Sequence, residues 1–173
     1  MENKIYAVIG TGSIGQRHLA NLKSLKQEVI GYSYSGKNGK IYNDIQIKEF
    51  DLEKIKNNDQ IAAIIIANRT DLHIDVALQM AKVGKHLYIE KPLTNSMINL
   101  NELHQEIINK NLMVECGFMY RAHPSLKWIK NYLTAGELGE IWYVRSCVGQ
   151  WLPSWRPNTN YKTGYGAYKK YGG

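Results

Sequence analysis

The stretch KIYAVIGTGSIG, residues 4–15, decides the fold that this sequence predicts. Its apolar run Ile5–Ile9 is rich in β-branched side chains and alternates poorly, which is typical of a strand buried on both faces. Three glycines follow at G-x-G-x-x-G spacing, and a helical pattern begins among them. A strand, a glycine loop and a helix in this order predict the first unit of a doubly wound α/β fold with a parallel sheet.

Each glycine of the loop has its own physical reason. Gly10 permits the tight turn, Gly12 lets backbone N–H groups approach a pyrophosphate, and Gly15 lets the helix lie close to the strand. The helix start at Ser13 and Ile14 then offers unpaired N–H groups and the positive end of the helix dipole to phosphates. We therefore expect these five residues to bind the cofactor of a Rossmann domain, NAD or NADP.

Composition excludes several classes of protein. A chain of 173 residues holds one domain, or one domain and part of another, and 44% hydrophobic with 21% charged residues is ordinary for a globular protein. The net charge of +7 comes from scattered lysines and arginines, so a solvated basic surface is favoured over nucleic-acid binding. No run approaches a membrane-spanning length and no signal peptide is evident, so the simplest location is cytoplasmic.

The two cysteines, Cys116 and Cys147, each lie in a predicted strand, where free buried thiols are common. Neither has the spacing of a metal ligand, and two cysteines do not make a disulfide framework. We therefore expect no metal site.

Periodicity predicts alternating strands and helices up to residue 120. Strands are expected over 5–9, 28–35, 45–50, 61–67, 86–89 and 112–116. Helical segments are expected over 13–25, 52–57, 71–83 and 96–109, with Thr70 as the N-cap of the third. This alternation indicates βαβ units, so residues 1–120 are predicted to form a Rossmann domain with five or six parallel strands.

The second strand ends without the acid that usually accepts a hydrogen bond from the adenosine ribose, about 20 residues past the glycines. That place holds Ser33 or Ser35, and Lys37 follows. A serine beside a cation suits a 2′-phosphate better than a bare ribose. The sequence therefore leans toward NADP.

Beyond residue 120 the pattern changes. Pro124 opens a predicted helix over 124–135, residues 140–148 alternate as a long strand, and an aromatic, glycine-rich loop follows. One helix, one strand and a loop cannot bury the strand's face, so residues 121–173 are expected to begin an α+β substrate domain with an open sheet. Either the domain is incomplete or a partner completes it, and association as a homo-oligomer through this sheet is expected.

Three stretches resemble the glucose-fructose oxidoreductase/inositol dehydrogenase (Gfo/Idh/MocA) family. They are VIGTGSIGQRHLANL at 8–22, the run from Asn68 and His73 through GKH at 84–86 to EKP at 90–92, and GFMYRAHP at 117–124. The resemblance implies an NAD(P)-dependent oxidoreductase that transfers hydride at a secondary alcohol of a sugar, sugar nucleotide or cyclitol. It also implies a catalytic Asp-x-x-x-His segment after a glycine cluster like Gly172-Gly173, so residues 1–173 alone are not expected to be a competent dehydrogenase.

The resemblance makes Lys91 the candidate catalytic residue. Lys91 follows a strand at the carboxyl edge of the sheet, where it can hydrogen-bond the substrate hydroxyl and stabilise an alkoxide by its charge. The alternative is an exposed lysine before a proline that starts a helix. Its neighbour Glu90 is expected among the cofactor-binding residues.

Other candidates flank the same edge. Asn68 follows the central strand and either bonds the nicotinamide ribose or amide or is a plain turn asparagine, and His73 lies in the next helix's first turn. Tyr120 either covers the nicotinamide or has a packing role.

Arg156 resembles family residues that close over the cofactor. Arg121 and His123 are expected to contact substrate. The remaining histidines are interpreted as core or surface residues, namely His18, His86 and His104.

Two other functions stay open at this point. One is a regulatory nucleotide-binding protein that lost catalysis, and the other is an interaction module whose strand at 140–148 pairs with a partner's sheet. An in-frame Asp-x-x-x-His encoded after Gly173 favours the enzyme, and a stop codon favours either alternative.

Overall fold

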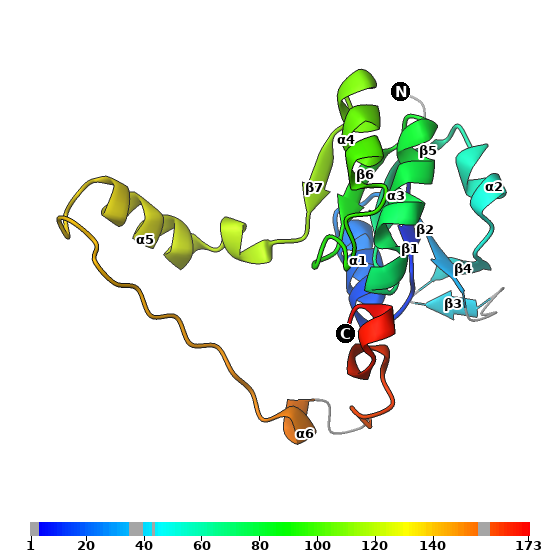
Figure 1. Ribbon diagram of the computed structural model, residues 1–173. Coiled ribbons are helices and arrows are strands. Elements are labelled where there is room, and N and C mark those ends of the chain that lie inside the picture. Colours follow the sequence, from blue (N-terminus) through cyan, green and yellow to red (C-terminus); the bar gives the residue numbers. More distant parts are fainter. Residues whose placement is uncertain (1–3, 35–39, 43, 156–159) are drawn as a thin grey trace.

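The computed structural model describes residues 4–34, 40–42, 44–155 and 160–173. Its centre is a seven-stranded sheet (Figure 1). In sheet order the strands are β3 (Lys40–Tyr42), β4 (Ile45–Glu49), β2 (Glu28–Ser33), β1 (Ile5–Ile9), β5 (Ile61–Ile66), β6 (His86–Ile89) and β7 (Val114–Cys116). All pairings are parallel except that of β3 with β4. The predicted parallel Rossmann sheet is confirmed.

Helices cover both faces of the sheet. They are α1 (Ser13–Ser24), α2 (Leu52–Lys56), the 3₁₀ turn η1 (Thr70–Leu72), α3 (His73–Lys82) and α4 (Leu100–Asn109). Along β1, Ala7 and Ile9 pack into the core beneath α2, α3 and α4, while Val8 packs with Leu19 of α1 on the other face. Each fully buried aliphatic side chain contributes about 1.5–3 kcal/mol. Strands with two apolar faces therefore hold the helices on both sides.

Three local predictions need correction. Strand β3 was not predicted, because it lies in a polar stretch that pairs only at the sheet edge. The helix predicted from residue 96 begins at Leu100, since Asn99 adopts a left-handed conformation at φ +63°. Thr70 is buried inside η1 rather than capping α3, whose N-cap makes no side-chain hydrogen bond.

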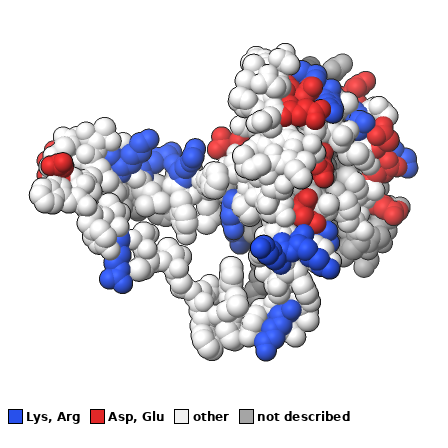
Figure 2. All heavy atoms as spheres, viewed as in Figure 1, with Lys and Arg blue, Asp and Glu red and all other residues white. Residues whose placement is uncertain are grey.

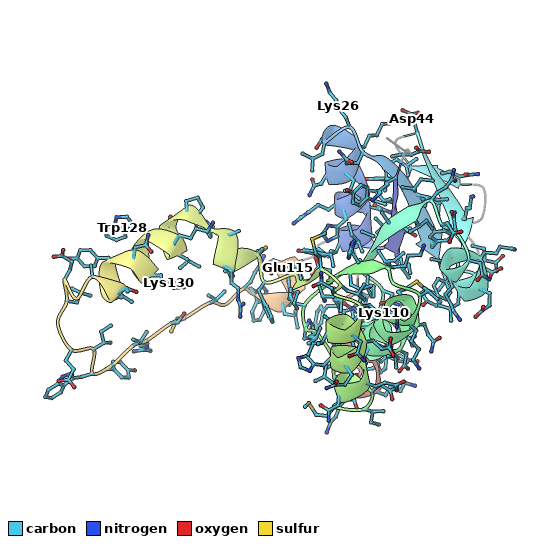
Figure 3. All side chains as sticks on the ribbon, turned by 90° about the horizontal axis from the view of Figure 1, so that it is seen from above. Lys26, Asp44, Lys110, Glu115, Trp128 and Lys130 are labelled. Carbon is cyan, nitrogen blue, oxygen red and sulfur yellow. The ribbon has the colours of Figure 1, made fainter. Side chains whose placement is uncertain are left out.

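After β7 the chain leaves the sheet. The 3₁₀ turn η2 (Met119–Ala122) and α5 (Pro124–Thr134) project from it, and Figure 3 shows Trp128 and Lys130 on α5, apart from the sheet. The prediction of a long strand at 140–148 was wrong. Residues 141–150 run without regular structure, because no described strand supplies a hydrogen-bonded ladder. Cys147 is accordingly exposed, whereas Cys116 lies half-buried in β7.

The chain then turns back. It passes α6 (Leu152–Trp155) and two 3₁₀ turns, η3 (Tyr165–Ala167) and η4 (Lys169–Tyr171), and ends beside α3 (Figure 1). Among the described residues from Phe118 onward none is classed as buried, so this part has no core of its own. The division into a domain at 1–120 and the start of another at 121–173 stays a prediction.

Described helices are all too short or too polar to cross a membrane, and no cluster of described His, Cys, Asp or Glu side chains could hold a metal ion. Figure 2 shows that the lysine and arginine side chains of one face form several separate groups. Aspartate and glutamate side chains lie between these groups on the larger part of the molecule.

Candidate cofactor site

The candidate site lies where four parallel strands end side by side. The carboxyl ends of β2, β1, β5 and β6 are neighbours in the sheet. Helix α1 leads from β1 to β2 on one face, whereas α3 leads from β5 to β6 on the other. The strand order therefore reverses between β1 and β5, and open α/β sheets bind ligands in the crevice at such a point.

The three glycines of the loop have different surroundings. Gly10 has φ +96°, and a Cβ there would lie 2.5 Å from the Ala67 carbonyl oxygen. A Cβ on Gly15 would lie 1.7 Å from the Gly10 carbonyl oxygen, so the helix packs directly on the loop. Apart from its chain neighbours, no described residue has an atom within 4 Å of a Cβ on Gly12, which leaves open space beside the start of α1. That space suits a pyrophosphate on the helix N-terminus.

At the end of β2 the side chain on the site edge is Tyr34, which sequence reasoning missed. Ser33 is 3% exposed and so lies in the core, and Ser35 and Lys37 lie outside the described residues. The Tyr34 ring stacks on Phe50 with centroids 4.1 Å apart, and burial raises the pKa of its hydroxyl. Strand alternation could have revealed Tyr34, because Ser33 and Tyr34 must point in opposite directions.

Asn68, just after β5, has one side-chain oxygen that the described residues leave unsatisfied. Its Nδ2 donates to the Tyr34 hydroxyl at 3.3 Å, while its Oδ1 is buried and has no hydrogen-bond partner among the described residues. A buried acceptor without a donor is costly, by about 1–3 kcal/mol. An N–H or O–H group of a bound cofactor would satisfy it, so both Gly12 and Asn68 fit a dinucleotide.

His73 lies behind Asn68 as the first residue of α3 and is 1% exposed. Its Nε2 lies 3.2 Å from the Asn68 carbonyl oxygen, and its Nδ1 lies 3.0 Å from the Pro92 carbonyl oxygen. Carbonyl oxygens only accept, so each contact is a hydrogen bond only where that ring nitrogen carries a hydrogen, and a neutral ring donates to one of the two carbonyls. In either tautomer the ring lies between the turn after β5 and the turn after β6. The described contacts of His73 are thus with backbone.

The turn after β6 carries Glu90 and Lys91. The Glu90 Oε1 accepts a hydrogen bond of 2.8 Å from His18 Nε2, and Oε2 accepts one of 3.2 Å from the Lys91 backbone N–H. The His18 hydrogen bond is the main reason that the pKa of Glu90 lies below its ordinary value. Lys91 itself is exposed at the edge. The sequence predicts a core or surface role for His18, and its contact with Glu90 depends on the packing of α1 beside β6, where the His18 ring meets Tyr88.

The remaining candidates are not gathered here. Tyr120, Arg121 and His123 are exposed on η2 and at the start of α5, and none forms a described hydrogen bond with the glycine loop or the Lys91 turn. Arg121 instead lies over the Phe118 ring. Arg156 lies outside the described residues.

The end of the chain meets the same edge. The Arg69 guanidinium bonds both Asp71 carboxylate oxygens, at 3.0 and 2.8 Å, and lies 4.1 Å from the Tyr171 ring centroid. Gly172 packs so closely on Thr70 that a Cβ there would lie 2.6 Å from the Thr70 Cβ. Gly172 therefore lies beside residues that follow β5 and β6.

A reversed strand order, an open glycine loop and an unsatisfied acceptor at one edge define a dinucleotide-binding Rossmann protein. Residues 4–118 match the Gfo/Idh/MocA oxidoreductase family, which has an NAD-binding Rossmann fold. The chain belongs to this family.

Relatives of the chain include dehydrogenases of cyclitols. Scyllo-inositol 2-dehydrogenase (NAD⁺) of Bacillus subtilis is 28% identical over 152 residues, which are 84% of this chain and 44% of that protein. Myo-inositol 2-dehydrogenase of Thermotoga maritima is 24% identical over 144 residues, 80% of this chain and 43% of that protein. The chain thus spans less than half the length of these relatives.

Solved structures share the fold. Scyllo-inositol dehydrogenase of Lactobacillus casei, with bound NAD(H) and scyllo-inositol, matches 80% of this chain and 43% of its own at a TM-score of 0.68 and 20% identity. Myo-inositol 2-dehydrogenase of Lactobacillus plantarum matches with a TM-score of 0.70 at 22% identity, over 80% of this chain and 43% of its own.

The Glu90 contact has a consequence for stability. Because its pKa is lower in the folded state than in the unfolded chain, Glu90 stabilises the fold above about pH 4.3, and this stabilisation is lost as the pH falls through the folded pKa. We expect Glu90→Gln to reduce the free energy of unfolding by about 1–2 kcal/mol at pH 7 and by less at pH 3.5. Urea unfolding at both pH values checks this, and an equal difference at the two would contradict it.

Proposed function

We propose that the chain is the cofactor-binding part of an NAD(P)-dependent oxidoreductase that acts on a secondary alcohol of a sugar, sugar nucleotide or cyclitol. The observation that carries the proposal is the open space at Gly12, in line with Asn68 and Lys91 along one sheet edge. The cyclitol dehydrogenases among the relatives support the substrate class.

Each residue has a role in this proposal. The loop at Gly10–Gly15 and the N–H groups of Ser13 and Ile14 hold the pyrophosphate, with Tyr34 on the adenosine side. Asn68 Oδ1 accepts from the nicotinamide half, and His73 and Glu90 position the flanking turns. The nicotinamide, when bound, takes or gives the hydride.

Lys91 is proposed to act on the substrate. Its exposed ammonium group donates a hydrogen bond to the reacting hydroxyl, and its charge stabilises the oxygen. The hydroxyl proton would pass to the acid/base histidine that the family resemblance implies, and the hydride would pass from carbon to the nicotinamide. Tyr120, Arg121, His123 and Arg156 are proposed to approach this position from the segment after β7. We further propose that this segment joins copies of the protein into a homo-oligomer.

The test separates binding from turnover. Residues 1–173 are expected to bind NAD(P)H but to show at most a trace of alcohol oxidation, because a missing acid/base group costs about 10²–10⁴-fold. A polypeptide that continues past Gly173 into an Asp-x-x-x-His segment is expected to oxidise a cyclitol or sugar, with absorbance at 340 nm as the readout. Lys91→Met should abolish that oxidation and leave cofactor binding intact. Robust turnover by protein whose mass matches residues 1–173 would contradict the first expectation.

A further prediction concerns the two cofactors. No acid is present among Ser33, Tyr34 and Ser35 at the end of β2, and Lys37 follows, so nothing there repels a 2′-phosphate. We expect the chain to bind NADPH at least as tightly as NADH. Parallel fluorescence titrations measure both, and a tenfold or larger preference for NADH would refute the expectation.

A further inference from the structure

The Lys91 turn is held from both faces of the sheet. On one face, His73 of α3 contacts the Pro92 carbonyl oxygen at 3.0 Å. On the other, His18 of α1 bonds the Glu90 carboxylate at 2.8 Å. Lys91 stands between these two anchored residues, with its side chain exposed and its backbone N–H bonded to Glu90.

The His18–Glu90 contact is enclosed rather than superficial. The two side chains are 16% and 17% exposed, so solvent screens the contact less than it would at the surface. The His18 ring meets the Tyr88 ring edge to face with centroids 5.2 Å apart. A Cβ on Gly117 would lie 3.2 Å from Glu90 Oε2, so a side chain there would crowd the carboxylate.

The hydrogen bond fixes the ring's protonation at one atom. A carboxylate accepts and does not donate, so His18 Nε2 must carry its hydrogen. The carboxylate then bridges two donors, His18 Nε2 and the Lys91 N–H. Helix α1 begins at the glycine loop, so this bridge links the pyrophosphate-binding helix directly to the turn that presents Lys91.

We propose that His18 is a positioning residue: through the Glu90 carboxylate it sets the Lys91 turn against the nicotinamide half of the cofactor. The inference rests on the proposed function. In the proposed complex the end of β2 lies beside the adenosine of the cofactor and the glycine loop beside its pyrophosphate. The Lys91 turn follows β6, which lies beyond β5 on the other side of the point where the strand order reverses. Loss of His18 should therefore weaken binding of the nicotinamide half and spare the rest.

The experiment compares two ligands on the chain of residues 1–173. NADH reaches the Lys91 turn, whereas ADP contains only the adenosine and pyrophosphate that bind on the other side of the crevice. Dissociation constants for both are measured calorimetrically for the wild type, His18→Ala and His18→Gln. Glutamine retains an N–H donor at similar reach. His104→Ala, at an exposed histidine of α4, is the matched control.

We expect His18→Ala to weaken NADH binding about tenfold while ADP binding changes less than twofold, and His18→Gln to restore most of the NADH affinity. His104→Ala should behave as the wild type. Equal weakening of both ligands in the two His18 variants would show a general role in helix α1 and overturn the inference, as would unchanged NADH affinity in His18→Ala. A wild type that does not bind NADH would instead refute the proposed function, together with the inference built on it.

Discussion

Gly12→Val should abolish binding of NADH and NADPH while the fold stays intact. A Cβ at this position would have no described atom within 4 Å apart from those of its chain neighbours, so a valine has open space to enter. Its backbone, at φ −71° and ψ −168°, is extended and accessible to any residue. The side chain would fill only the space in which the pyrophosphate meets the N–H groups of α1. We expect affinity to fall by at least about 100-fold, equivalent to roughly 2.8 kcal/mol.

Calorimetric titration measures the loss, and circular dichroism with thermal unfolding verifies the fold. Gly149→Val is a suitable control, because a Cβ there also has no described atom within 4 Å apart from its chain neighbours, and Gly149 lies in the irregular path at 141–150. It should bind NADH as the wild type does. Normal affinity in Gly12→Val with an unchanged spectrum would mean that the loop does not hold phosphates.

Gly15→Ala should damage the fold instead of the site. Its Cβ would stand 1.7 Å from the Gly10 carbonyl oxygen and 2.8 Å from the Gly10 carbonyl carbon, and backbone atoms cannot yield as a flexible side chain can. Helix α1 must therefore move away from β1. Overpacking of this kind costs about 3 kcal/mol, which for a chain of this size lowers the Tm by about 6–12 °C.

Gly12→Ala is the matched control for stability, since it adds the same methyl group three residues earlier in open space. Thermal unfolding of both variants should show a large shift for Gly15→Ala and almost none for Gly12→Ala. Equal midpoints would show that the close approach of α1 to the glycine loop has no energetic weight.

The fold could be predicted because its signals are local. Buried strands such as β5 are continuous apolar runs, and the glycine spacing marks the one turn that a Rossmann domain must begin with. Strand β3 and the irregular path at 141–150 could not be predicted in the same way. Alternation shows that a segment can form a strand, but hydrogen bonds to a neighbour decide whether it does, and sequence pattern does not identify that neighbour.

The site was only partly predictable for a related reason. Residues that lie just after a strand, such as Gly10 after β1 and Asn68 after β5, lie at the carboxyl edge of the sheet as predicted. Contacts made between distant segments were missed. The His18–Glu90 hydrogen bond spans 72 residues of sequence, and Tyr34 meets Asn68 across 34. Such pairs depend on how α1 packs on the sheet and on the strand order that brings the ends of β2 and β5 to one edge, which no single motif encodes.

The measurement that tests the central claim most directly is calorimetric titration of NADH into residues 1–173, with ADP-ribose as competitor. The claim is that one dinucleotide binds at the glycine loop, along the edge that joins Gly12, Asn68 and Lys91. We predict saturable binding at one site per chain, displaced by ADP-ribose and lost in Gly12→Val. Absence of saturable binding at millimolar NADH, or binding that Gly12→Val leaves unchanged, would contradict the claim.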